Sequence, residues 1–233
     1  MNESDPRSYS YDTEYAAAKQ DFFISTYKTM AAGLFLTFAV ALIVVRFFPN
    51  VAYSAPAILF FCIAELVTVV LFSRRIATAS YSSARGMFFF YAALSGITFS
   101  SVFLCFDIQS VFLCFFASAC AFALMAFLGA TTMRDLSPMS RILYGGLLGL
   151  LLVTGLSLLF RFSGLDILIN AVGIVLFMGM TAYDSQKLGQ MFDQVAGTEI
   201  ADRYSLFAAL QLYLDFVNLF MYLLSFMGKR DRR

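Results

Sequence analysis

Three carboxylic side chains fall in apolar stretches of this sequence, where charge is expensive and few side chains can do chemistry. They are Glu65, Asp184 and Asp215. A charge at the centre of a bilayer costs on the order of 3 kcal/mol on insertion scales, so each acid is a candidate for binding a proton or a cation. For Glu65 the alternative is a protonated acid that is hydrogen-bonded to another helix. For Asp184 it is plain solvation, because that residue lies in the last turn of its stretch.

A polar stripe that includes Asp215 runs along the last apolar stretch. Its members recur at steps of three and four residues, which places them on one face of a helix. Such a stripe is expected to face a bundle interior or a water-filled cavity, so Gln211, Asn218 and Tyr222 are candidate pathway residues. Hydrogen bonding between neighbouring helices is the alternative role. The stripe comprises Tyr204, Ala208, Gln211, Asp215, Asn218, Tyr222 and Ser225.

Asp184 and Asp215 would form a proton-sensitive site if they met. Helices that start level with the membrane surface would place Asp215 about 10 Å deeper than Asp184, so a meeting requires the seventh helix to begin deeper or to tilt. Two carboxylates in a low-dielectric site share a proton, because both cannot ionise cheaply. The chain has no histidine, so such a pair is the natural route to a switch near neutral pH. Loss of the proton would part the helices or admit a hard cation such as Ca²⁺, with Asp184 and Asp215 as its transient ligands.

Cationic and catalytic partners for these acids are few. Arg74, Arg75 or Arg85 could act as a counter-ion, although anchoring at the membrane interface is the other role that fits them. Without histidine the chain lacks Ser-His and Cys-His catalysis and the common zinc sets, so we expect no enzyme and no cofactor. A net charge of +1 gives no indication of a nucleic-acid partner.

Seven apolar helices must position these residues. Of the 233 residues, 61% are hydrophobic and 13% are charged, and the mean hydropathy is +0.79. Soluble domains are about half apolar and about a quarter charged, so the solvent of this chain is the lipid bilayer. We therefore predict an all-α polytopic membrane protein, a seven-transmembrane-helix bundle with spans of about 20 residues. The predicted spans are Thr29–Phe48, Ala57–Phe72, Gly86–Phe106, Val111–Ala130, Ile142–Phe160, Ile167–Asp184 and Ser205–Met227.

The chain divides into a polar arm, a membrane domain and a short tail. Residues 1–27 are predicted to be a mobile cytoplasmic arm, residues 28–228 the seven-helix domain and residues 229–233 a basic tail. The longest predicted loop is 185–204. Lys and Arg gather in the loops of one side, which places the N-terminus in the cytoplasm. Seven full spans would leave the basic tail outside the cytoplasm, against that rule. Either the charge bias of the first six spans determines the orientation, or the last segment is re-entrant.

Four segments resemble motifs of the Bax inhibitor family, and specifically its bacterial branch. Residues 181–188 (TAYDSQKL) are similar to the Ala-Tyr-Asp-Thr-Gln motif at the end of the sixth helix, with Ser185 in place of Thr. Residues 209–220 (ALQLYLDFVNLF) resemble the Leu-Tyr-Leu-Asp-Phe-Ile-Asn-Leu-Phe motif of the final helix. Residues 96–103 (GITFSSVF) and 131–137 (TTMRDLS) resemble the third helix and the loop after the fourth helix.

The resemblance implies a bundle with the last helix at its centre. It also implies a pH-sensitive Ca²⁺ leak gated by Asp184 and Asp215, with Arg75 or Arg74 as the partner of the sixth-helix acid. The implied location is a bacterial inner membrane, with calcium as the transported ion. The alternative function is regulatory: bacterial members include a modulator of a membrane protease, and the arm and the tail would contact such an integral partner.

Overall fold

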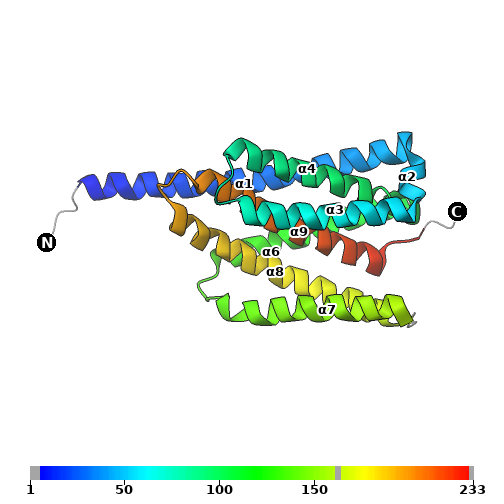
Figure 1. Cartoon of the computed structure of the whole chain (residues 1–233). Helices are drawn as coiled ribbons and strands as arrows, with labels where there is room; N and C mark the ends of the chain where they lie inside the picture. The colour runs from blue at the N-terminus through cyan, green and yellow to red at the C-terminus, as the bar shows by residue number, and fades with distance from the viewer. Residues whose placement is uncertain (1–5, 161–163, 231–233) are drawn as a thin grey trace.

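Helices make up nearly all of residues 6–160 and 164–230, which are the residues that the computed structural model describes. Seven helical segments are long and apolar enough to cross a membrane, which confirms the predicted all-α polytopic fold. They lie side by side in one elongated bundle (Figure 1). The elements are α1 (Pro6–Phe47), α2 (Pro49–Tyr53), α3 (Ala55–Arg75), α4 (Tyr81–Phe99), α5 (Val102–Cys105), α6 (Ile108–Thr131), the 3-10 turn η1 (Ser137–Met139), α7 (Ser140–Phe160), α8 (Leu165–Val195) and α9 (Ala201–Met227).

The outer surface of the bundle is apolar, as a surface that faces lipid must be. Phe35 is 78% exposed, and Leu59, Phe116, Leu152 and Val175 are also largely exposed on four other helices. A soluble monomer rarely exposes apolar side chains over so much of its surface. The hydrocarbon of the bilayer is therefore the medium that covers them.

Helix α9 lies at the centre of the bundle, as the family resemblance implies (Figure 1). It packs against α1, α4, α6 and α8. Tyr213, Leu219, Phe220 and Leu224 are fully buried along it. Both the apolar face and the polar stripe of α9 are thus covered by protein, because neighbouring helices surround α9 on several sides.

Two predicted boundaries are wrong, because hydropathy marks where the membrane ends and not where a helix ends. Helix α8 runs on to Val195, so the predicted loop 185–204 is helical except near Gly197, where φ is +74°. Helix α1 begins at Pro6, so the described part of the predicted mobile arm is also helical.

Contacts between α1 and α8 hold these two extensions together. The rings of Phe22 and Phe192 lie 5.4 Å apart, and both side chains are buried. Lys19 Nζ lies 2.9 Å from Asp193 Oδ1. Tertiary packing therefore stabilises helical turns that the local sequence, rich in polar residues, does not reveal.

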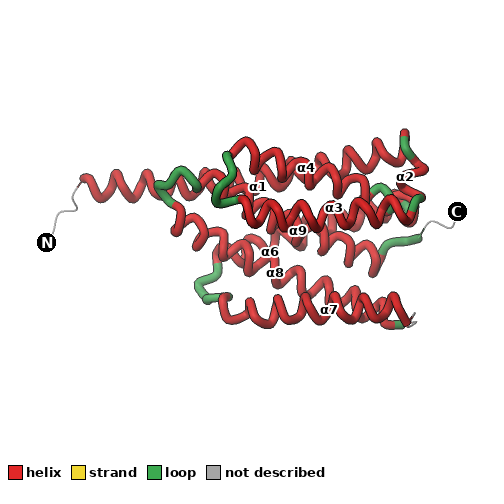
Figure 2. The backbone as a smooth tube through the Cα atoms, in the orientation of Figure 1, coloured by secondary structure: helices red, strands yellow, loops and turns green. Residues whose placement is uncertain are grey.

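The loops gather at two ends of the bundle, shown in green in Figure 2. The Arg-rich end holds loops 76–80, 132–136 and 196–200, and the tail end holds α2, Asp107 and the chain after Met227. At the tail end the Asp107 backbone N–H donates to the Lys229 carbonyl (2.9 Å), and the Lys229 N–H donates to Ser110 Oγ (3.1 Å). Because α9 is continuous and ends there, the re-entrant alternative for the last segment is wrong.

Candidate intramembrane acidic site

Asp184 on α8 and Asp215 on α9 meet inside the bundle. Their carboxyl groups lie close enough to interact, and the two residues are only 7% and 3% exposed. The longer α8 removes the expected difference in depth. Asp184 lies 11 residues before the end of α8, and Asp215 lies 14 residues after the start of α9. Three residues of helical rise amount to about 4.5 Å, which side chains can bridge.

Close helix packing fixes the pair in place. A Cβ atom on Gly173 of α8 would lie 2.5 Å from the Tyr222 ring of α9, so only glycine permits this approach. The Tyr222 ring also stacks on Phe177, with centroids 5.7 Å apart. On the other side of α8, a Cβ on Gly129 of α6 would collide with the backbone of Ala182, two residues before Asp184. Small residues on α6 and α8 thus set the position of both acids.

The buried oxygens of the pair lack hydrogen-bond donors. Oδ1 of Asp184 and Oδ2 of Asp215 are buried, and no donor of the described residues reaches either atom. A carboxylate only accepts hydrogen bonds, so one proton held between the two groups would satisfy both. Two ionised carboxylates in this place would repel each other at short range in a low dielectric.

The cation that acts on Asp184 is Lys187, three residues later on the same helix. Arg74 and Arg75 are exposed at the end of α3, and neither forms an ion pair with the acids within the described chain. Tyr144 of α7 lies near both carboxyl groups and packs edge-on against Tyr183. Sequence reasoning missed Lys187 and Tyr144. The helical spacing of Lys187 from Asp184 could have identified it as a partner. The predicted helix ended at Asp184, however, so this spacing was not considered.

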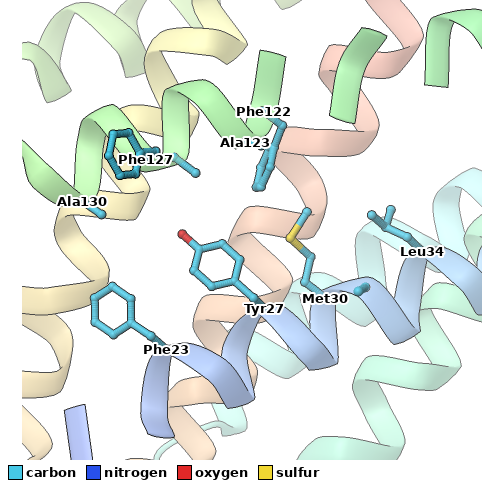
Figure 3. A pocket seen from close by; sticks show the side chains of 10 residues that line it. Phe23, Tyr27, Met30, Leu34, Phe122, Ala123, Phe127 and Ala130 are labelled. Atoms are coloured by element: carbon cyan, nitrogen blue, oxygen red, sulfur yellow. The ribbon is translucent and has the colours of Figure 1, made fainter. Parts of the chain in front are cut away.

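A third neighbour of the pair that the sequence did not reveal is Tyr27 of α1. Its hydroxyl donates to Ser185 Oγ at 3.5 Å, next to Asp184, and Ser185 is fully buried. Figure 3 shows the Tyr27 hydroxyl in an apolar groove between α1 and α6. The groove has a volume of about 520 Å³ and includes Met30 and Phe127 in its lining. Ser185, the residue that departs from the family motif, therefore keeps a hydroxyl with a partner.

A polar vestibule opens between α7, α8 and α9 at the tail end. Its volume is about 630 Å³, and it includes the predicted pathway residues Asn218 and Tyr222. Asn218 lies one helical turn from Asp215 on the same face. Gln211, on the other side of Asp215, is half-buried and does not line this vestibule. The lining residues are Thr154, Ser157, Asp166, Ile169, Asn170, Asn218, Met221, Tyr222, Ser225 and Arg230.

Glu65 does not join the aspartate pair. Its carboxyl group lies against α4, where Thr98 Oγ1 is 2.7 Å from Oε1. In the described parts of the chain, no group of three or more His, Cys, Asp or Glu side chains gathers at one place. The pair thus offers two carboxylates, fewer than the six to eight oxygens of a dedicated Ca²⁺ site.

Fold and site together define a multi-pass membrane protein with a buried acid pair between its central helix α9 and the adjacent α8. A family model described as "Inhibitor of apoptosis-promoting Bax1" matches residues 19–232, and the chain belongs to this family, the Bax inhibitor family. The inner membrane protein YbhL of Escherichia coli (strain K12) is 33% identical over 97% of this chain and 98% of its own length. A protein of Deinococcus radiodurans is 36% identical, with 90% and 91% covered. A protein of Borreliella burgdorferi is 41% identical, but the match covers only 65% of this chain and 66% of that protein.

Proposed function

We propose that this protein is a pH-sensitive leak for a hard cation, with the Asp184–Asp215 pair as its gate. The observation that carries the proposal is the meeting of two buried carboxyl groups on adjacent helices, each with an oxygen that no described donor satisfies. An intramembrane acid is expensive to bury, so a pair of them is better explained by ion or proton handling than by packing. The choice of Ca²⁺ rests on the family resemblance, since two carboxylates also serve other small cations.

In the proposed closed state, one shared proton joins the two carboxyl groups and so holds α8 against α9. When that proton leaves, two negative charges face each other at short range, and their repulsion favours separation of the helices. The same two charges attract a cation. The leak is therefore expected to increase as the pH rises.

The vestibule supplies the approach to this gate from the tail end. Asn218 lies nine residues before the end of α9, about 13.5 Å along the helix, and Asp215 lies three residues deeper. The Asn218 amide nitrogen donates to the Leu214 carbonyl (2.8 Å), which leaves Oδ1 for another partner. A cation that enters the vestibule would thus meet an amide oxygen first and the carboxylates next.

Calcium influx into liposomes tests the proposal. The purified protein is reconstituted around a Ca²⁺ dye, and influx is recorded from about pH 6 to about pH 8, the range of physiological switches. We expect influx above that of empty liposomes, rising with pH, and an altered pH dependence in Asp215→Asn. The matched control is Asp202→Asn, an exposed carboxylate near the start of the same helix. Influx equal to that of empty liposomes at every pH would contradict the proposal.

A bacterial inner membrane is the proposed location, by analogy with YbhL, and the Arg-rich end would face the cytoplasm under the positive-inside rule. We propose no enzymatic activity and no resident cofactor. The alternative, regulation of a membrane protease or another integral partner, was based on a mobile arm and a basic tail. The described part of that arm is helical and ion-paired to α8 through Lys19, so it does not favour this role.

A further inference from the structure

Glu65 is a half-buried intramembrane acid that the proposed gate does not use. It lies ten residues from either end of α3, about 15 Å along the helix in both directions. A glutamate side chain cannot reach the membrane surface over that distance. Its residue is only partly exposed, and no Lys or Arg of the described residues forms an ion pair with it. An unpaired charge at this depth is costly, so the surroundings must provide another solution.

The hydroxyl of Thr98 lies between two oxygen atoms, one from Glu65 and one from Ser95. Thr98 Oγ1 lies 2.7 Å from Glu65 Oε1 and 2.9 Å from the Ser95 carbonyl oxygen. A threonine hydroxyl has one hydrogen, and a backbone carbonyl only accepts. If the hydroxyl donates to the Ser95 carbonyl, the contact with Glu65 is a full hydrogen bond only when Glu65 carries the proton. The geometry thus favours a neutral carboxylic acid.

The same reasoning applies to Tyr213, on the far side of the cluster. Its hydroxyl lies 2.7 Å from Thr37 Oγ1, which in turn lies 2.9 Å from the Ala92 carbonyl oxygen and 3.0 Å from that of Gly33. If the single Thr37 hydrogen goes to a carbonyl, Tyr213 donates to Thr37. The Tyr213 oxygen is then free to accept a hydrogen bond from another direction.

Ser95 occupies the space between these two groups. Its residue is 1% exposed, and its Oγ makes no direct hydrogen bond to the described residues. The side chains of Glu65, Tyr91 and Tyr213 all approach it closely enough to interact. A buried hydroxyl without a partner is rare, and small rotations would link it to its neighbours. Hydroxyl groups of α4, α9 and α1 therefore form a row that extends from Glu65 across the bundle.

We propose that Glu65 is a second proton-binding site, in which depth in the membrane and the lack of a cationic partner keep the acid neutral while the Thr98 hydroxyl hydrogen-bonds to it. The titratable groups around it are Cys62 on α3, Tyr91 on α4 and Tyr213 on α9, and none of these is a cation. Helix α2 contributes only Tyr53, which is 72% exposed. Arg85, at the other end of α4, lies 13 residues before Thr98, about 20 Å along the helix. This site is separate from the aspartate pair and does not depend on ion conduction.

Infrared spectroscopy of the full chain in lipid vesicles tests the proposal. A protonated carboxylic acid has a carbonyl stretching band that a carboxylate lacks, and a solvated glutamate is almost fully ionised above about pH 6. We expect an acid band at about pH 7 that disappears in Glu65→Gln and persists in the double variant Asp184→Asn/Asp215→Asn. The control Glu199→Gln, at an exposed position, should leave the band unchanged.

Thr98→Val provides a second test in case Glu65→Gln does not fold. It removes the hydroxyl that is hydrogen-bonded to Glu65, so the acid band should shift to higher frequency and not vanish. A spectrum in which neither Glu65→Gln nor Thr98→Val alters any acid band would overturn the proposal. A carboxylate band that disappears in Glu65→Gln would do the same.

Discussion

At the level of single residues, the protein accommodates carboxyl groups within its membrane-spanning helices in two ways. Asp184 and Asp215 lie against each other, so one proton can serve both. Glu65 instead lies among hydroxyl groups, with Thr98 at 2.7 Å. The difference matters for function, because loss of one proton creates repulsion within the pair but leaves the single acid facing only neutral groups. We therefore assign the gate to the pair.

Asp135, in the loop after α6, offers a residue-level prediction outside the membrane. Hydrogen bonds from the Ser137 hydroxyl and the Ser137 backbone N–H (2.9 Å) lower the pKa of the exposed Asp135 carboxyl group. Ser137→Ala removes the hydroxyl only, so the pKa should rise part of the way to its ordinary value. A lowered folded-state pKa means that any stabilisation is present at neutral pH and is lost as the pH falls through that pKa. NMR titration of Asp135 measures the change, and identical curves for both proteins would contradict it.

At the level of elements, the contact between α6 and α8 controls the position of the acids. Gly129→Ala would place a methyl group against the Ala182 backbone, which cannot rotate away. Overpacking of this kind costs about 1–3 kcal/mol, so the thermal unfolding temperature of Gly129→Ala in detergent should fall. Gly145→Ala is the matched control, because no atom lies within 4 Å of a Cβ there. Equal unfolding temperatures for the two variants would show that α6 and α8 are not closely packed at this point.

The number and order of the spans could be predicted from the sequence, because an apolar run long enough to cross a membrane rarely forms anything other than a membrane span. The ends of α1 and α8 could not be, since their outer turns depend on contacts such as Phe22 with Phe192. The polar stripe of α9 indicated Asp215 directly. The meeting with Asp184 came only from the family resemblance, because spacing alone placed the two acids at different depths. Nothing in the sequence indicated a role for Tyr27, because its partner Ser185 is 158 residues away.

For the whole molecule, the charge distribution and the positions of the two ends predict a topology. The described basic residues at the tail end are few, and Lys229 and Arg230 are among them. The loops at the Arg-rich end contain or adjoin Arg74, Arg75 and Arg134. Under the positive-inside rule the first six spans outweigh the short basic tail. With an odd number of spans, we then expect the tail to lie outside the cytoplasm.

Thiol labelling in intact cells tests this topology. In a background without the native cysteines, Thr78→Cys would lie at the Arg-rich end, and Asn50→Cys and Lys229→Cys at the tail end; all three positions are exposed. A reagent that cannot cross the membrane should label positions 50 and 229 in intact cells and position 78 only after permeabilisation. Labelling of positions 78 and 229 from the same side would contradict the seven-span topology.

The central claim, that Asp184 and Asp215 act as one proton-operated unit, is tested most directly by calcium influx in a double-mutant cycle. Influx would be recorded from about pH 6 to about pH 8 for the wild type, Asp184→Asn, Asp215→Asn and the double variant. We predict that each single variant loses the pH dependence and that the double variant behaves like a single one, because a pair that has lost one member has nothing left to share. Independent, additive effects of the two substitutions, or pH dependence that survives in the double variant, would contradict the account.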